Sequence, residues 1–212
     1  MVVAIGVGIG LFSVIGGLVL AVMRLSKHKA LSRTAQTYVW IFRGTPLLVQ
    51  LIIIYTGLPQ LGLVRFSVLE SAIIGLALNE AAYLSEILRG GILSVAKGQT
   101  EAARALGLKP YAIFRLVVLP QALRVIIPPL GNSVNGLLKT TSIASVISME
   151  EVLRRGQILM QQKFQVLEVF VVVAILYLVM TTCWDFVQRR IEAYYGRAYG
   201  AVENKQLARD DH

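Results

Sequence analysis

The sequence predicts an all-α, polytopic membrane protein with five transmembrane helices. Composition is the first reason, because 56% of the 212 residues are hydrophobic and only 16% are charged, whereas soluble domains carry about 25% charged residues. The second reason is the spacing of the charges, since residues 1–23 and 44–64 contain none. Each run can cross a hydrocarbon core, which takes about 20 apolar residues in a helix. A soluble helical protein with a large core is the weaker alternative.

Three further spans are predicted, although each contains ionisable side chains. The five spans are residues 2–23, 44–64, 67–88, 125–149 and 164–187. The ionisable residues inside the last three are Glu70, Glu80, Glu86, Lys139, Glu168 and Asp185. We expect residues 1–200 to form a single transmembrane domain, followed by a polar cytoplasmic tail at residues 201–212.

The distribution of Lys and Arg predicts the orientation in the membrane. Five basic residues lie between the first two spans, one after the second, six after the third, three after the fourth and five in the C-terminal region. This alternation is the positive-inside pattern, and it places the amino terminus outside and the carboxyl terminus in the cytoplasm. The net charge of +9 is therefore a topology signal and does not indicate nucleic-acid binding. The first span lacks the basic residues that precede the apolar core of a signal peptide, so we interpret it as a retained helix.

Several kinds of chemistry lack the residues they need. The sequence has no GxxxxGK[ST] loop for nucleotide phosphates. Its two histidines, His28 and His212, fall outside the predicted spans, and Cys183 is the single cysteine. We therefore expect no enzymatic activity, no metal site, no internal disulfide and no cofactor in this chain.

The loop at residues 98–120 predicts two short helices outside the bilayer. Residues 99–106 are good helix formers that end at Gly107, and Pro110 suits the first turn of a second helix, which Pro120 would end. Small side chains beside Glu101 and Arg104 would let a partner backbone approach closely. An ordinary amphipathic connector explains the same composition.

The spacing within this loop resembles the EAA loop of ABC-transporter permease subunits. That pattern is Glu-Ala-Ala, three residues, Gly, nine residues, an aliphatic residue, one residue and Leu-Pro. The matching residues here are Glu101, Ala102, Ala103, Gly107, Val117, Leu119 and Pro120, with valine in place of the usual isoleucine. The resemblance implies a coupling helix that docks into a cleft of an ATP-hydrolysing subunit through Glu101, Ala102, Ala103 and Gly107.

Other segments resemble the polar amino-acid permeases, the group that includes histidine and glutamine importers. They are FRGTPLLVQL (42–51), AAYLSEILRGGI (81–92), LPQALRVIIPPLGN (119–132) and TSIASVIS (141–148). The position after Lys139 is often aspartate in that group but is Thr140 here, so no ion pair is carried over.

The resemblance implies a permease of a binding-protein-dependent ABC importer in the bacterial cytoplasmic membrane. Its expected partners are ATPase subunits that bind the ATP, a second permease subunit (identical or a paralogue), an extracytoplasmic substrate-binding protein, a polar amino acid and the lipid bilayer, with no nucleic acid. The alternatives are a permease for another small solute such as methionine, or a non-transporting scaffold that recruits an ATPase.

Polar residues in the third and fourth spans are the candidates for a substrate path. They are Asn79, Glu80, Asn132, Asn135, Lys139, Thr141 and Ser142. Pro128 and Pro129 lead us to expect a broken helix at the start of the fourth span, as transporters use to build such paths. Glu80 would contact a substrate ammonium group, and Lys139 a substrate carboxylate. A buried, hydrogen-bonded Glu80 and plain helix packing are the alternatives.

Two further contacts follow from spacing. Glu86 and Arg89 are three residues apart on one helical face and can form an ion pair. Residues 150–163 are polar enough for a short surface helix on the outer side, where the resemblance implies contact with the binding protein; a solvated connector is the alternative.

Overall fold

A computed structural model describes the backbone of residues 2–210, and the side chains of residue 6 and residues 8–195. Residues 2–210 contain helices and no strand, so the all-α prediction is confirmed. The α-helices are α1 (Val2–Leu25), α2 (Lys29–Gly44), α3 (Leu47–Ile52), α4 (Leu58–Gln60), α5 (Val68–Leu93), α6 (Lys97–Ala105), α7 (Pro110–Ile113), α8 (Leu119–Thr140), α9 (Val152–Lys163) and α10 (Val166–Asp210). Two π-helical turns (Ile53–Gly57 and Phe114–Val118) and a 3₁₀ helix (Thr141–Ile147) join neighbouring helices.

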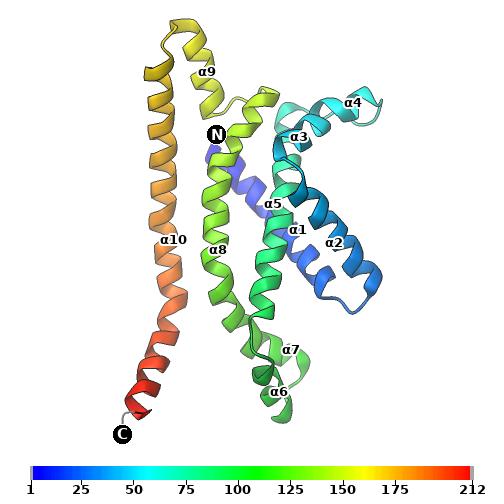
Figure 1. Ribbon diagram of the computed structural model, residues 1–212, viewed down its shortest axis with the longest axis vertical. Helices are drawn as coiled ribbons and strands as arrows, with labels where there is room; N and C mark the ends of the chain where they lie inside the picture. The colour runs from blue at the N-terminus through cyan, green and yellow to red at the C-terminus, as the bar shows by residue number, and fades with distance from the viewer. Residues whose placement is uncertain (1, 211–212) are drawn as a thin grey trace.

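The helices are arranged around α5 and α8 (Figure 1). Helix α5 packs on α1, α2, α3 and α8, whereas α10 packs on α8 and α9. The α1–α2 turn, α6, α7 and the carboxyl end of α10 lie toward the lower end of the molecule in Figure 1, and α4 and the α9–α10 turn lie toward the upper end. Three segments with several Lys or Arg residues therefore lie toward one end, whereas α9, which has three, lies toward the other.

Length and composition identify four helices or helix runs that can cross a membrane: Gly8–Leu25, Val68–Leu93, Pro110–Ile147 and Val166–Tyr195. A fifth span results if the pair Lys29–Gly44 and Leu47–Gln60, bent by 103°, is counted as one. This count, made on the described residues, agrees with five predicted spans.

The second span differs from its prediction. Helix α2 occupies residues that we expected to form a cytoplasmic loop, and the predicted span at residues 44–64 covers only the second arm of the bent pair. Helix α2 lies outside the uncharged stretch at residues 44–64 because it is amphipathic. It buries Ala35 and Val39 while its basic side chains are exposed. The bend follows from Thr45 and Pro46, which are both extended and precede α3.

The expected breaks at the prolines of the fourth span are wrong. Pro128 and Pro129 lie inside α8, which is continuous from Leu119 to Thr140, and the helical run that begins at Pro110 continues through Pro120. Helix α10 packs against this stretch of α8, where Trp184 Nε1 donates to the Gly131 carbonyl at 2.8 Å. Irregular backbone begins later, in the 3₁₀ helix.

The last span also continues further than predicted. Helix α10 extends to Asp210, so residues 201–210 of the predicted tail are helical in their backbone; residues 211 and 212 lie outside the described residues.

Small residues allow α5 to approach its neighbours closely. A Cβ atom added to Gly17 of α1 would lie 2.8 Å from the Leu84 Cβ, and one added to Gly91 of α5 would lie 2.2 Å from the Ile126 Cγ1. Close packing of this kind is what associates helices in a membrane, where the hydrophobic effect between them is weak. At its amino-terminal end α5 begins with a capping box between Ser67 and Glu70.

Candidate functional site

A cavity of about 550 Å³ lies between the α2–α3 bend, α5 and α8. Its lining residues are Arg43, Gly44, Thr45, Pro46, Leu47, Asn79, Glu80, Tyr83, Ser133, Gly136, Leu137 and Thr140. Two of the predicted path residues, Asn79 and Glu80, are among them. The bend that sequence analysis missed therefore supplies one wall of the cavity.

The carboxyl group of Glu80 is bound from the opposite wall. Ser133 Oγ of α8 donates a hydrogen bond to Glu80 Oε1. The other carboxylate oxygen has no hydrogen bond among the described side chains. Glu80 is thus hydrogen-bonded to a neighbouring helix, which was one of the two alternatives for this residue. Its second carboxylate oxygen can still accept a hydrogen bond from a further donor.

Asn79 holds the bend in place. Its Nδ2 donates to the Phe42 carbonyl at 2.9 Å and to Gln50 Oε1 at 3.1 Å. Gln50 Nε2 donates in turn to Thr45 Oγ1 at 2.8 Å. This network satisfies backbone and side-chain groups where α2 ends, which is the condition for irregular backbone at membrane depth.

The face of α8 that lines the cavity is adjacent to the predicted one. Ser133, Gly136 and Thr140 line it, at spacings of three and four residues. The predicted Asn132, Asn135 and Lys139 have the same spacing but precede these positions by one residue, a rotation of about 100°. The small and hydroxyl residues at helical spacing were the signal that could have identified the correct face.

The other predicted residues of the fourth span have different surroundings. Asn135 Nδ2 donates to Asp185 Oδ1 of α10 at 2.6 Å. Asn132 and Lys139 are exposed on this chain. Thr141 is buried and donates to the Leu138 carbonyl, and Ser142 donates to the Lys139 carbonyl. None of the five lines the Glu80 cavity.

A second, smaller cavity of about 380 Å³ is lined by residues of α1, α2 and α5. The two share Arg43, Gly44 and Tyr83. The predicted ion pair between Glu86 and Arg89 is confirmed at 3.0 Å, and Glu86 also forms an ion pair with Arg24 of α1. Sequence spacing could not reveal the Arg24 contact because it joins two helices far apart in the chain.

Arg43 stands between the two cavities. Its guanidinium carbon lies 5.2 Å from the centre of the Tyr83 ring, a cation–π contact. Among the described side chains, Arg43 forms no ion pair with a carboxylate. In the sequence Arg43 is one of five basic residues between the first two predicted spans, and no local pattern indicates that it lines a cavity.

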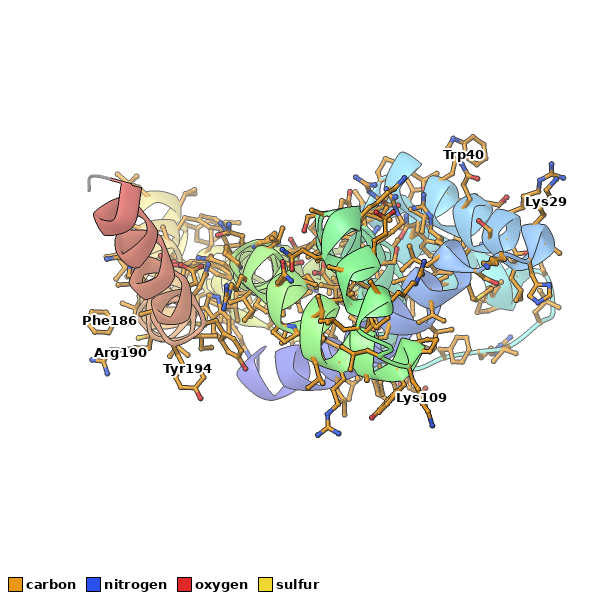
Figure 2. The ribbon with its side chains drawn as sticks, turned by 90° about the horizontal axis from the view of Figure 1, so that it is seen from below. Lys29, Trp40, Lys109, Phe186, Arg190 and Tyr194 are labelled. Atoms are coloured by element: carbon orange, nitrogen blue, oxygen red, sulfur yellow. The ribbon has the colours of Figure 1, made fainter. Side chains whose placement is uncertain are left out.

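The loop between α5 and α8 projects from the end of the molecule that also holds the carboxyl end of α10 (Figures 1 and 2). Helix α6 ends as predicted: Gly107 has a φ of +77°, Leu108 N donates to the Ala103 carbonyl at 3.2 Å, and Gly107 N donates to the Arg104 carbonyl at 2.9 Å. These two bonds form a Schellman motif, for which glycine is the favoured residue.

The predicted docking residues do not all lie on the surface of this loop. Glu101 and Ala102 are exposed, and so is Leu106, at 81%. Ala103 is 4% exposed and packs with Ile113 and Val118 in a small apolar cluster. Ala103 therefore joins α6 to its own chain and is not available to a partner.

Residues 150–163 contain a helix, α9, as predicted. Glu151, which is 3% exposed, accepts bonds from the Leu153 and Arg154 backbone N–H groups at 2.8 and 2.5 Å. Tyr177 of α10 donates its hydroxyl to the same carboxylate at 2.7 Å. This cap fixes α9 against α10. Among the described side chains, no group of three or more His, Cys, Asp or Glu could hold a metal ion.

Residues 13–195 match the family described as binding-protein-dependent transport system inner membrane component. The chain belongs to this family. It is thus a membrane component of a transport system and not an enzyme, and the family implies an ATPase and a substrate-binding protein as partners. The match covers both cavities and the α6 loop.

Curated relatives and solved structures are similar over most of the chain. A probable amino-acid permease protein, YxeN, from Bacillus subtilis is 39% identical over 191 residues, which are 89% of this chain and 85% of the relative. A nopaline transport system permease protein, NocM, from Agrobacterium fabrum is 45% identical over 170 residues, which are 76% and 70% of the two chains.

Among solved structures, a chain from the crystal structure of an amino acid ABC transporter with histidines is 36% identical. It superposes with a TM-score of 0.86 over 92% of this permease and 90% of that chain. A methionine ABC transporter chain, with a TM-score of 0.73 and 92% coverage of both chains, is 23% identical and shows the shared fold.

Proposed function

We propose that this permease is the path-forming subunit of an ATP-driven importer for polar amino acids. The observation that carries the proposal is the Glu80 cavity, a polar site between three membrane helices. Relatives named as amino-acid permeases support the substrate class. Residues 1–200 act as a single transmembrane domain, with the amino terminus outside and the carboxyl terminus in the cytoplasm.

A path explains why the membrane region contains Glu80. A charged side chain at the centre of a membrane helix costs about 2.5–3.5 kcal/mol on insertion scales. The ammonium group of an amino acid would offset this cost by binding the carboxylate directly. A scaffold that only recruits an ATPase gains nothing from such a group, so the cavity favours transport over the scaffold alternative.

Helix α6 is the proposed coupling helix. Glu101 and Ala102 are exposed and meet a cleft of the ATPase subunit, and Leu106 extends the same surface. Ala103 and Gly107 position the helix, through the apolar cluster and the Schellman motif. Closure of two ATPase subunits on ATP moves the coupling helices of two permease subunits, identical or paralogous, and so alternates access to the path.

Co-purification tests the coupling role. The permease is co-expressed with its ATPase partner, and ATP turnover is compared among wild type, Glu101→Arg and the control Gln99→Arg. Gln99 is exposed on the same helix but outside the motif. Reversal of the Glu101 charge is expected to lower association or coupled turnover by more than about tenfold, because opposed like charges cost several kcal/mol. Equal behaviour of the two variants would reject α6 as the coupling helix.

Uptake by the complete transporter tests the path. Labelled glutamine, histidine, arginine and methionine are supplied to vesicles that contain wild type or Glu80→Gln. Loss of uptake in the variant, with ATPase association intact, is the expected result. Unchanged uptake would remove Glu80 from the path, and uptake of methionine alone would favour the alternative substrate.

A further inference from the structure

The Glu80 cavity contains one acidic and one basic side chain that are not paired with each other. Glu80 lies on α5 and Arg43 at the end of α2, and both line the same space. No ion pair joins them within the described residues. We propose that Arg43 binds the carboxylate of the transported amino acid while Glu80 binds its ammonium group, so that the cavity selects zwitterionic α-amino acids by two-point recognition. This inference rests on the proposed function, because it assigns the substrate-binding roles within that path.

Arg43 lines the cavity at a position where a substrate carboxylate could reach it. The α2–α3 bend, fixed by Asn79 and Gln50, places the last turn of α2 at the edge of the cavity. The Tyr83 ring contacts the guanidinium at 5.2 Å but supplies no negative charge. A guanidinium offers its donors in a planar fork that matches a carboxylate.

The other basic residues near the cavities are less suited to this role. Arg24 and Arg89 are both bound to Glu86, so their charges are already compensated in part. Lys139, which we expected to bind the substrate carboxylate, does not line the cavity, whereas Arg43 does; both side chains are exposed on this chain. Arg43 is the only Lys or Arg that lines the Glu80 cavity among the described residues.

A zwitterion balances the charges of this cavity. An isolated charge in a low-dielectric region is costly unless an opposite charge and hydrogen bonds compensate it. Glu80 and Arg43 bring one charge of each sign, and the ammonium and carboxylate of an α-amino acid bring the complementary two. An amine or an ester satisfies only one of the two protein groups and leaves the other unpaired.

Binding to the purified permease–ATPase complex, without the substrate-binding protein, tests the assignment. The probes are L-glutamine, L-histidine and L-arginine, each compared with its methyl ester at a pH acidic enough to keep the ester's amino group protonated, so that the ester retains the ammonium group and side chain but loses the carboxylate charge. In wild type the acids are expected to bind about tenfold to a hundredfold more tightly than the esters, as for one charge-assisted hydrogen-bonded contact.

Three substitutions separate the roles of the basic residues. Arg43→Gln is expected to bring the acid-to-ester ratio to about one, by weakening the acid and leaving the ester unchanged. Arg43→Lys, which keeps the charge, should retain part of the preference. Arg33→Gln, an exposed site on the same helix that lines neither cavity, should preserve the full ratio.

The outcomes distinguish this inference from the proposed function. If Glu80→Gln weakens binding of acid and ester while Arg43→Gln keeps the acid preference, the function stands and the Arg43 assignment is overturned. Collapse of the ratio in Lys139→Gln instead would overturn it as well. If both Arg43 variants lose binding of the amino acids and of their esters while ATPase association is intact, a carboxylate-specific role of Arg43 is contradicted as well. Failure of wild type to bind any of the three amino acids would reject the proposed function together with this inference.

Discussion

Helices α5 and α10 both cross the membrane but relate to the rest of the chain in opposite ways. In the apolar stretch of α5 half of the residues are buried inside the protein, whereas in that of α10 the share is 6%. Figure 2 shows Phe186, Arg190 and Tyr194 of α10 pointing away from the other helices. One helix is a central support, and the other is a peripheral one that meets its own chain along a single narrow face.

This difference in burial between α5 and α10 explains which faces of the two helices contain ionisable side chains. Glu86 of α5 is bound by two arginines, and Glu80 by Ser133 of α8, so each has a partner from the same bundle. On α10, Asp185 lies on the face toward α8, where Asn135 binds it. Between residues 169 and 180 the exposed side chains of α10 are apolar, and the exposed charged residues among its described side chains, Glu168, Arg189 and Arg190, lie on either side of that stretch.

The largest expected effect follows from filling the contact between α5 and α8. A Cβ at Gly91 would lie 2.2 Å from Ile126 Cγ1 and 3.2 Å from the Ala122 carbonyl oxygen, whereas nothing lies within 4 Å at the neighbouring Gly90. Gly91→Leu should lower the free energy of unfolding by about 3 kcal/mol or more through overpacking. Unfolding by SDS titration measures this, with Gly90→Leu as the control. Equal stability of the two variants would contradict close packing at α5.

A smaller effect is expected from Glu86→Gln. The side chains of Arg24 and Glu86 are 16% and 21% exposed, so the variant leaves Arg24 largely buried without its carboxylate. We expect a loss of about 2 kcal/mol in unfolding free energy, below the ~3–5 kcal/mol of a fully buried pair. Glu70→Gln is the control, since glutamine can replace glutamate in a capping box. A loss no greater than that of the control would mean that the ion pair does not support the α1–α5 contact.

The smallest effect is expected on the outer face of α10. Leu178 is 65% exposed on this chain, so Leu178→Ala should change the unfolding free energy by less than about 0.5 kcal/mol. Val173 is 7% exposed and packs beside Gly156, so Val173→Ala should lower the free energy of unfolding by about 1 kcal/mol. The same SDS titration compares the two. A larger loss at Leu178 would indicate that a second subunit covers this face in the assembled transporter.

Features that depend only on residues close together in the chain could be predicted from the sequence. The α6 loop is one: its Glu-Ala-Ala pattern, the stop at Gly107 and the Schellman bonds all involve residues within a few positions of one another. The Glu86–Arg89 pair and the presence of four long apolar helical runs are of the same kind. Their determinants (helix spacing, apolar length and local capping) act along the chain, without reference to distant segments.

The candidate site was predicted only in part, because it depends on packing. Asn79 and Glu80 were identified, since an acidic residue in an apolar stretch stands out wherever it points. The lining of α8 was misplaced by one residue, because apolar length fixes where a helix crosses but not how it is rotated about its axis. Arg43 was missed because α2 is amphipathic and its place beside Tyr83 follows from a bend.

The sequence by itself therefore determined the helical class, the number of crossings and the α6 motif. These features follow from hydropathy, charge and the spacing of residues that are close together in the chain, and they do not depend on which segments pack together. Only the tertiary structure decided that α2 continues into a bent span, that Ala103 is directed inward, and that Arg43 and Glu80 line one cavity. Those outcomes depend on which faces of α2, α5 and α8 pack together, and that choice is made by contacts between residues far apart in the chain.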